Sequence, residues 1–205
     1  MHTMRRLLAL VVLTATAACG SGHQDDAQVD SGLVDTTPIP GLAVVFDAPA
    51  LGMPIGPVTI TEAELSVRDL RVIGDANHYG VTAAALDLPG VVDVVDAPPG
   101  LYGALEFRLS SWELRGSVLI DQRPFELRIS SDQTSPTIML PLELPLDVGV
   151  RRLILVAVDL ATVVNVVDWS TVPVEGDRIR LDDASSLAPS FTTGMLDAFA
   201  VTGIE

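Results

Sequence analysis

The chain has one cysteine, three histidines and few aromatic residues, which make up 4% of its 205 residues. A single cysteine, Cys19, excludes an intramolecular disulfide, so the folded part must be stabilised by its own core. Only His78 lies beyond residue 40, and no Gly-x-Ser-x-Gly motif is present, which argues against hydrolases with a serine or cysteine nucleophile and a histidine base. A zinc site needs three or four converging ligands, so we interpret His78 as a surface residue.

Lysine is absent, and all twelve basic residues are arginine. Against them stand 27 aspartate and glutamate residues, and the formal net charge is −15. An electric field of this sign repels nucleic acid and anionic lipid head groups. We therefore expect no nucleic-acid partner.

The N-terminal residues follow the order of a secretory leader. Arg5 and Arg6 precede the apolar run 7–13, small residues follow in 14–18, and Cys19 comes next. The apolar run is much shorter than the ~20 residues needed to cross a bilayer, so residues 1–18 are predicted to be a cleaved signal peptide. Their removal takes away two arginines and no acidic residue, which moves the formal net charge from −15 to −17.

The end of the leader resembles the lipobox of bacterial lipoproteins, because Cys19 directly follows Ala17 and Ala18; Thr16 stands where the lipobox prefers an aliphatic residue. The resemblance implies that Cys19 is lipidated and anchors the mature protein in a lipid bilayer. Gly20 resembles the outer-membrane sorting pattern, so we expect an exported envelope protein whose soluble domain lies in the periplasm or at the cell surface. The alternatives are a secreted protein with a leftover thiol and a buried core cysteine.

Residues 20–40 are rich in Gly, Asp, Ser, Thr and Pro and have no apolar periodicity. A segment of this composition cannot bury enough surface to fold. Residues 19–40 are therefore predicted to be the lipidated cysteine and a flexible tether with a span of roughly 25 Å. Residues 41–205 then form one domain.

The domain is predicted to be mainly β, a single antiparallel β-sandwich of about seven to nine strands with one or two short helices near the C-terminus. Short runs of Val, Leu and Ile alternate with Gly, Pro, Asp and Asn. The expected strands are 41–49, 58–74, 101–112, 117–121, 125–129, 138–146 and 153–160.

Alternation in 101–112 predicts one core face and one solvent face. The expected core residues are Leu101, Leu105, Phe107 and Leu109. The expected solvent-facing residues are Tyr102, Glu106, Arg108 and Trp112.

Turns at 115–116 and 121–124 are expected to join adjacent antiparallel strands, a meander in which Glu106 and Arg108 pair across strands with Glu126 and Arg128. Pro141 and Pro145 make 138–146 an edge strand, since proline donates no ladder hydrogen bond.

The strand 153–160 is apolar on both sides and is expected to be central and fully covered. In 58–74 the apolar parity changes, which predicts a bulge at 68–69. Helical turns are expected in 161–169 after Asp159, and in 190–199 with Ser190 as the cap.

At four places the sequence resembles a family of bacterial lipoprotein domains of unknown function, expected to be transthyretin-like or immunoglobulin-like β-sandwiches. The residues that carry the resemblance are FDAP (46–49), ALDLPG (85–90), APPGLYGALEFRL (97–109) and LVAVDLATVV (155–164). The most telling piece is Pro99-Gly100-x-Tyr102, a chain reversal followed by an amphipathic tyrosine at the start of a strand. The family implies a fold and a location, and no established activity.

Two acidic segments are weak metal candidates. Asp75 and Asn77 fall at the first and third positions of an EF-hand pattern, which then fails at Tyr79 and Leu86. Asp182 and Asp183 form the other segment, and the alternative is that such residues cap turns.

Tyr102 and Trp112 are the weak candidates for binding a partner. The alternative for Trp112 is an aromatic residue that caps the core. A sugar-binding face normally carries several aromatic platforms, and this chain has few aromatic residues.

These patterns favour a membrane-anchored, non-catalytic binding or structural module of unknown ligand, with no enzyme activity and no cofactor. The lipid bilayer is its expected partner through acylated Cys19, and the protein or glycan partner is open. The alternative is a carbohydrate- or calcium-assisted adhesion domain, followed by a hydrolase that uses two carboxylates.

Overall fold

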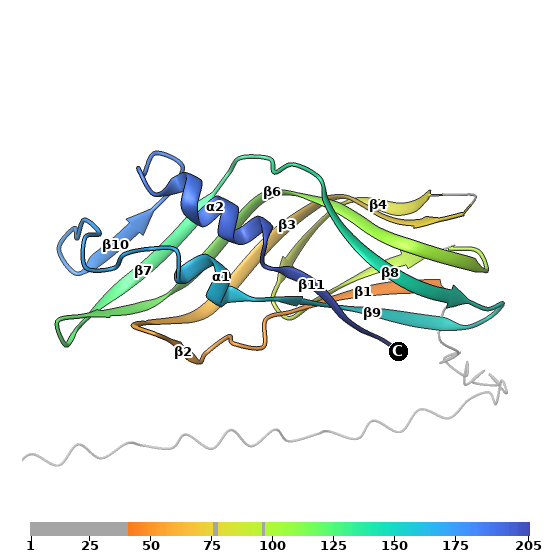
Figure 1. Ribbon diagram of the computed structural model, residues 1–205, viewed down its shortest axis with the longest axis horizontal. Coiled ribbons are helices and arrows are strands. Elements are labelled where there is room, and N and C mark those ends of the chain that lie inside the picture. The colour runs from red at the N-terminus through yellow and green to blue at the C-terminus, as the bar shows by residue number, and fades with distance from the viewer. Residues whose placement is uncertain (1–40, 76–77, 96) are drawn as a thin grey trace, which may run out of the picture. The chain divides into compact units, whose positions relative to one another are not determined.

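The computed structural model describes residues 41–75, 78–95 and 97–205 (Figure 1). The predicted signal peptide, Cys19 and the tether lie outside these residues. Along the described chain the elements are β1 (Gly41–Asp47), β2 (Pro54–Ile55), β3 (Val58–Gly74), β4 (His78–Asp87), β5 (Gly90–Val95), β6 (Gly100–Ile120), β7 (Arg123–Ser131), β8 (Ile138–Leu146), β9 (Arg151–Val158), α1 (Leu160–Val164), β10 (Arg178–Leu181), α2 (Ala188–Leu196) and β11 (Phe199–Ile204). Neither helix in the described ranges has the length and apolar character that crossing a membrane requires.

The strands form two sheets, as the predicted sandwich requires. The smaller sheet has the order β11-β9-β1-β5, and the larger has the path β10-β7-β6-β3-β2, with β4 on β3 and β8 on β6. The described residues contain eleven strands, more than the seven to nine expected. The mainly β sandwich is confirmed and most of its strand pairs are antiparallel; two neighbouring pairs, β1 with β9 and β7 with β10, are parallel.

The long strand β6 is the spine of the larger sheet. It pairs with β3 along most of its length, with β8 beside its first half and with β7 beside its second half. The predicted turn at 115–116 is wrong, because the chain continues straight through Gly116. A Cβ on Gly116 would lie 1.9 Å from the Thr59 carbonyl oxygen, so the glycine allows β3 to approach closely. The turn after β6 is where it was predicted, at Asp121 and Gln122, which both have positive φ.

Two irregularities in β6 change which side chains face the core. The first lies between Tyr102 and Ala104, and it leaves Leu101 54% exposed and Tyr102 3% exposed. The second, in the pairing with β3, lies between Leu109 and Ser111 and turns Trp112 inward, where it is 4% exposed. The prediction that Tyr102 and Trp112 face solvent was therefore wrong, as was the core position of Leu101.

The predicted bulge in β3 is confirmed. The pairing with β6 shifts register between Arg68 and Arg71, and Asp69 has a φ of 51°. β8 is an edge strand as predicted, since it pairs with β6 alone in the described part of the chain.

β9 is a central strand as predicted, because it lies between β1 and β11. Leu153 and Leu155 on its outer side are only half buried, so the expectation that both faces of this strand are buried was wrong.

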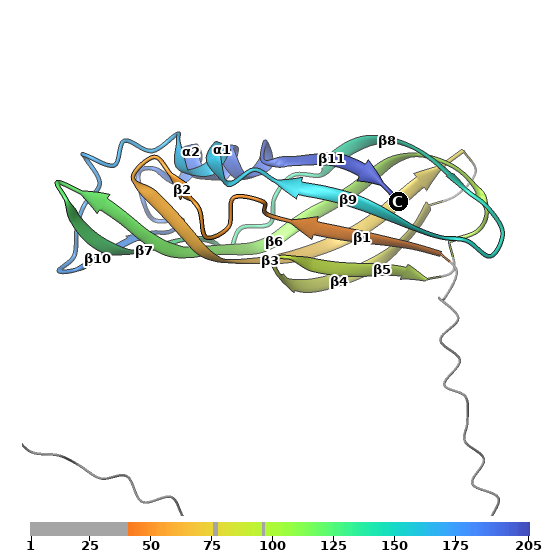
Figure 2. The same ribbon diagram turned by 90° about the horizontal axis from the view of Figure 1, so that it is seen from below.

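The larger sheet is covered by two different layers, which Figures 1 and 2 show side by side. One layer is the smaller sheet, and the other consists of α1 and α2, which lie over the end of the larger sheet that contains β7 and β10. α1 begins after Asp159, as the sequence predicts, but it ends at Val164 and covers only the first part of the expected range 161–169. The Asp159 carboxylate caps it by accepting a hydrogen bond from the Ala161 N–H. α2 begins at Ala188 rather than Ser190, and Phe199 belongs to β11, so both of those details were wrong.

Candidate functional site

The outward face of the larger sheet carries a row of alternating charges. Residues two apart on a strand share a face, so Ala63 and Leu65 enter the core while Glu62 and Glu64 face outward. On β6, Glu113 and Arg115 face outward in the same way. The register places Glu62 opposite Arg115 and Glu64 opposite Glu113. Four charged side chains therefore meet at the middle of the sheet.

Arg115 is the centre of this row. Its guanidinium lies 3.3 Å from a Glu62 carboxylate oxygen and 3.7 Å from one of Glu64, and its Nε donates to Glu113. The hydrogen bond with Glu113, followed by the charge of that carboxylate, raises the pKa of Arg115 above its usual value. Arg115 therefore stays charged and is committed to three carboxylates.

Glu113 bridges two arginines. Its second carboxylate oxygen accepts a hydrogen bond from Arg128 on β7 at 2.5 Å. Partial burial raises the pKa of Glu113, but the hydrogen bonds and charges of Arg115 and Arg128 outweigh this and leave the pKa below 4.5. The side chain is accordingly ionised at neutral pH.

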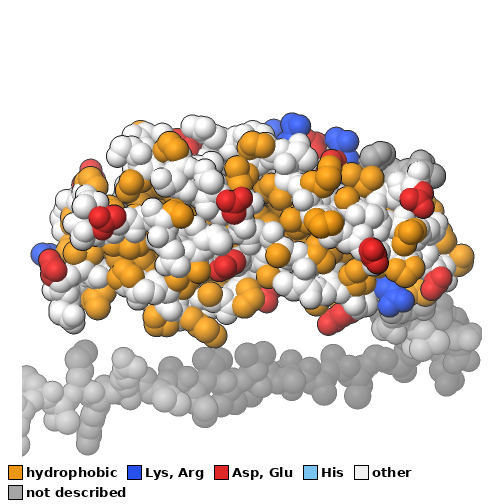
Figure 3. Space-filling model, in the orientation of Figure 1, with side chains coloured by type: hydrophobic (Ala, Val, Ile, Leu, Met, Phe, Trp, Pro, Cys, Tyr) orange, Lys and Arg blue, Asp and Glu red, His pale blue; other side chains and the backbone are white. Residues whose placement is uncertain are grey.

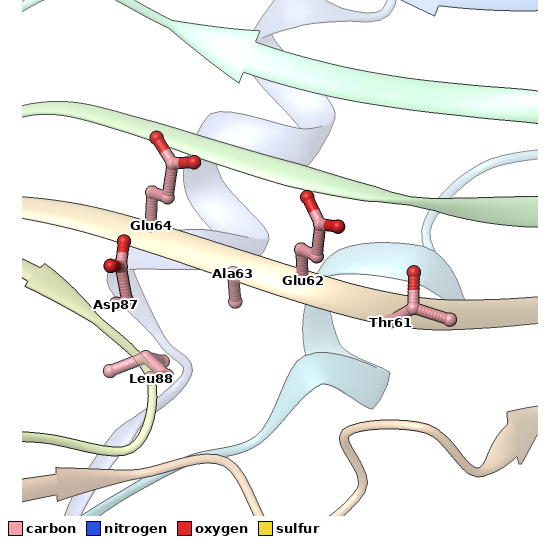
Figure 4. A pocket seen from close by; sticks show the side chains of 6 residues that line it. All are labelled: Thr61, Glu62, Ala63, Glu64, Asp87 and Leu88. Atoms are coloured by element: carbon pink, nitrogen blue, oxygen red, sulfur yellow. The ribbon is translucent and has the colours of Figure 1, made fainter. Parts of the chain in front are cut away.

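A cavity of about 290 Å³ lies at one end of this row, where β3 meets the end of β4. Its lining residues are Thr61, Glu62, Ala63, Glu64, Asp87 and Leu88. Figure 4 shows the carboxylates of Glu62, Glu64 and Asp87 on the same side of the sheet, with Asp87 beside Glu64. Two of these three carboxylates are paired with Arg115, and Asp87 forms no ion pair with any described residue.

A second cavity, of about 300 Å³, lies at the other end of the row. It is lined by Glu113, Arg128, Ser130, Asp132, Arg180, Asp182, Asp183 and Ala184. The ion pair between Arg180 and Asp182, at 3.5 Å, links β10 to the following loop. Charged side chains thus continue across β3, β6, β7 and β10.

The structure gives the predicted metal candidates backbone partners. The Asp182 carboxylate accepts a hydrogen bond from the Ala184 N–H at 3.0 Å, as in a turn, and the Asp183 carboxylate accepts one from the Asp132 N–H at 2.9 Å. Asp75 is exposed at the end of β3, and Asn77 lies outside the described residues. Within the ranges that the structure covers, no three His, Cys, Asp or Glu side chains are grouped so as to hold a metal ion.

Both predicted binding aromatics lie in the core. The Tyr102 hydroxyl donates to the Pro98 carbonyl at 2.7 Å, which ties the start of β6 to the preceding turn. Trp112 packs edge-to-face on Phe191 of α2, with ring centroids 5.8 Å apart, as in the alternative in which it caps the core. Neither side chain is placed to anchor a partner at the surface.

The expected pairing of Glu106 and Arg108 with Glu126 and Arg128 was wrong. β8, not β7, lies beside the part of β6 that holds Glu106 and Arg108. Glu126 instead pairs with Arg178 at 3.0 Å.

The sequence patterns did not lead us to predict the row of alternating charges on β3 and β6. The signal was present in the period of two, since TEAEL places two glutamates on one face of β3 and WELR places Glu113 and Arg115 on one face of β6. Which strands lie side by side was the missing information.

Comparison with known proteins finds no match to this chain among protein-family models, curated proteins or solved structures.

Proposed function

We propose that this chain is a lipid-anchored protein of the bacterial envelope, exported and held through acylated Cys19, whose β-sandwich is a non-catalytic binding or structural module. The anchor rests on the sequence Ala17-Ala18-Cys19-Gly20 at the end of a short apolar leader. The domain begins at β1, so residues 20–40 separate it from the anchor. We place the protein at the outer membrane, with the domain in the periplasm or at the cell surface.

The observation that supports the non-catalytic assignment is the pairing of the charged row. Arg115 is paired with Glu62, Glu64 and Glu113, and Arg128 is also paired with Glu113. A hydrolase with two carboxyl groups needs one of them protonated near neutral pH, which requires a raised pKa. The pKa of Glu113 is lowered by Arg115 and Arg128. The charged row is thus built to hold the sheet face in one arrangement, and it is poorly suited to proton transfer.

The acidic surface of the protein limits which partners it can bind. Few arginines and many dispersed acidic side chains lie on the face in Figure 3. Together with the net charge of −17 expected for the mature chain, this favours a neutral or cationic partner over an anionic one.

Calcium-assisted adhesion is the alternative from the sequence. Glu62, Glu64 and Asp87 line one cavity, but the described carboxylates include no group of three placed to hold a metal ion, so the structure does not favour this alternative. A calcium titration of the unfolding temperature tests it, with Asp87→Asn as the variant. A rise with Ca²⁺ that Asp87→Asn removes would favour adhesion, while no rise leaves the module without a metal.

Lipid anchoring is tested by Cys19→Ser in the full chain, with Ser21→Ala as the matched control. We expect Cys19→Ser to abolish incorporation of labelled palmitate and to release the protein from membranes, because residue 19 loses the sulfur that carries the lipid. Ser21→Ala should behave as the parent chain. If Cys19→Ser still fractionates with membranes, the anchor hypothesis fails.

A further inference from the structure

The outer face of the smaller sheet has no cover in the described part of the chain. On β1, Phe46 enters the core, so its neighbour Val45 points to the other side of the sheet. On β9, Val156 enters the core and Leu155 points outward in the same way. Figure 2 looks onto this outer face and shows β11, β9, β1 and β5 next to one another, with no other described strand or helix in front of them.

The outer face is apolar, although the solvent-facing side of a sheet is normally polar. The register places Val45 between Val91 of β5 and Leu155 of β9. Leu155 in turn lies beside Gly203 of β11, so one apolar row crosses all four strands. Val91 is 55% exposed, and Val45 and Leu155 are half buried. The row therefore leaves aliphatic side chains in contact with solvent.

The charged side chains of this face lie at its margins. Arg151 at the start of β9 pairs with Asp93 on the edge strand β5 at 2.5 Å. Asp47 is the last residue of β1, and Glu205 follows β11. On the larger sheet, by contrast, the row of alternating charges occupies the middle of the outward face. The two outer surfaces of the sandwich thus differ in polarity.

The sequence of β9 also indicates a cover. From Leu153 to Val158 both its inward and its outward positions are apolar, a pattern typical of a strand that is buried on both faces. The larger sheet covers the inward positions, and the described chain leaves the outward positions open. An occupant from outside the described chain would complete the pattern.

The size of the face limits what that occupant can be. Four strands with about five residues each present roughly 300 Å². A stable protein–protein interface buries about 800 Å² on each partner. A second copy seated on this face alone would be held weakly, and it would bring two strongly acidic domains together. A bilayer needs no surface of matching shape.

The position of the tether brings a bilayer within reach of this face. β1 lies in the smaller sheet between β5 and β9, and it begins at Gly41, directly after the predicted tether 20–40. Val45 lies about 13 Å along β1 from Gly41. The tether spans roughly 25 Å, so an anchored chain keeps the face close to the membrane. A small apolar area is then sufficient for contact, because the anchor already supplies a high effective concentration.

We propose that the outer face of the smaller sheet rests on the neutral phospholipid bilayer that holds Cys19, with Val91, Val45 and Leu155 at the boundary of head groups and acyl chains. The inference rests on the proposed lipid anchor. The net negative charge of the chain disfavours anionic head groups, while neutral ones tolerate the charges at the margins of this face. The charged face of the larger sheet then points away from the membrane.

Site-specific fluorescence tests the orientation in the full chain, purified from membranes and reconstituted in vesicles of phosphatidylcholine and phosphatidylethanolamine. Val91→Cys carries an environment-sensitive label on the outer face. Ser117→Cys, exposed on the outward face of the larger sheet, is the matched control. Lipids that carry a quencher near the head group should quench the label at position 91 about threefold more strongly than the label at position 117. The parent chain measures background labelling of Cys19, which acylation blocks.

The outcomes separate this inference from the anchor itself. Equal quenching of the two labels in chains that float with the vesicles would overturn the inference and leave the anchor in place. A parent chain that does not float with the vesicles would overturn the anchor and the inference with it. A label at position 91 that is shielded from water but not reached by the lipid quencher would mean that a protein covers the face, which also overturns the proposal.

A charge placed in the row tests the contact with lipid. With the label at Ala200→Cys, another exposed position of the outer face, Val91→Asp should reduce quenching by about half, because a carboxylate is disfavoured at the boundary of head groups and acyl chains. Leu119→Asp adds the same charge at a residue that is 46% exposed on the larger sheet and should leave quenching unchanged. Circular dichroism checks that both variants are folded. Undiminished quenching in folded Val91→Asp contradicts the proposed contact.

Discussion

The two halves of the larger sheet share the long strands β3 and β6 and are covered by different layers. Over one half lies the smaller sheet, where Phe46 of β1, Phe107 of β6 and Phe199 of β11 meet edge-to-face. Their ring centroids are 5.1 to 6.4 Å apart. The strands of this layer are also joined to each other by backbone hydrogen bonds.

Over the other half lie α1 and α2. α1 has five residues, too few to be stable without tertiary contacts, since isolated helices shorter than about 12 residues are marginal in water. Its approach to α2 depends on Gly194, where a Cβ would lie 2.4 Å from the Thr162 carbonyl oxygen. This layer is held by side-chain packing, chiefly Phe191 on Trp112. We therefore expect the helical layer to be the less stable of the two covers and to open first.

The largest effect is expected in the half covered by the smaller sheet. Phe107→Ala removes the ring that contacts both Phe46 and Phe199, and its side chain is fully buried. We expect a loss of about 4 kcal/mol in the free energy of unfolding, measured by urea denaturation with circular dichroism. Leu119→Ala, on the same strand but 46% exposed, is the control. A loss below about 1 kcal/mol for Phe107→Ala would contradict the importance of the three rings.

Phe191→Ala tests the helical layer. It should cost about 3 kcal/mol, because Trp112 loses its aromatic neighbour and a cavity forms. Trp112 and Trp169, which donates to the Val164 carbonyl at the end of α1, both report on this half. Tryptophan emission in the variant should therefore change at lower urea than the circular dichroism signal. Ser190→Ala, exposed on the same helix, is the control, and a single shared transition would argue against separate opening.

Asp159→Ala addresses α1 alone. Its carboxylate accepts from the Ala161 N–H at 2.9 Å, so its removal should cost about 1 kcal/mol. Asp147→Ala removes the same charge from an exposed turn and should change stability by less than about 0.5 kcal/mol. Equal effects of the two variants would show that charge, and not capping, is measured.

The sequence predicted well what depends on neighbouring residues. The parity change in β3 located the bulge at Asp69, the prolines identified β8 as an edge, and Asp159 was recognised as the start of α1. Each of these signals is local, because a backbone angle, a missing N–H or a capping side chain acts within a few residues.

The predictions that failed depend on which strand lies beside which. Leu101 continued the apolar alternation of Leu105 and Phe107, and only the irregularity opposite β8 moved it into solvent. Gly116 was predicted to make a turn, because a sequence does not distinguish a turn glycine from one that allows close approach of another strand. The charged row was missed for the same reason, since Arg115 and Glu62 are 53 residues apart.

An effect no larger than that of Asp159→Ala is expected on the outward face of the larger sheet, at Glu113 between the inward-facing Trp112 and Leu114. Glu113→Gln breaks the pairs with Arg115 and Arg128 and should cost about 1 kcal/mol at pH 7, the range of a good surface network.

The pH dependence distinguishes this loss from a packing defect. Because the folded pKa of Glu113 lies below 4.5, its contribution is present above that pH and disappears as the pH falls through the folded value. The difference in unfolding free energy between parent and Glu113→Gln should shrink as the pH is lowered from 7 toward 3. Glu143→Gln on β8, which breaks no ion pair among the described residues, should show no such trend. A constant difference across this range would mean that Glu113 stabilises the sheet through its shape, and that the charges of the row contribute nothing measurable.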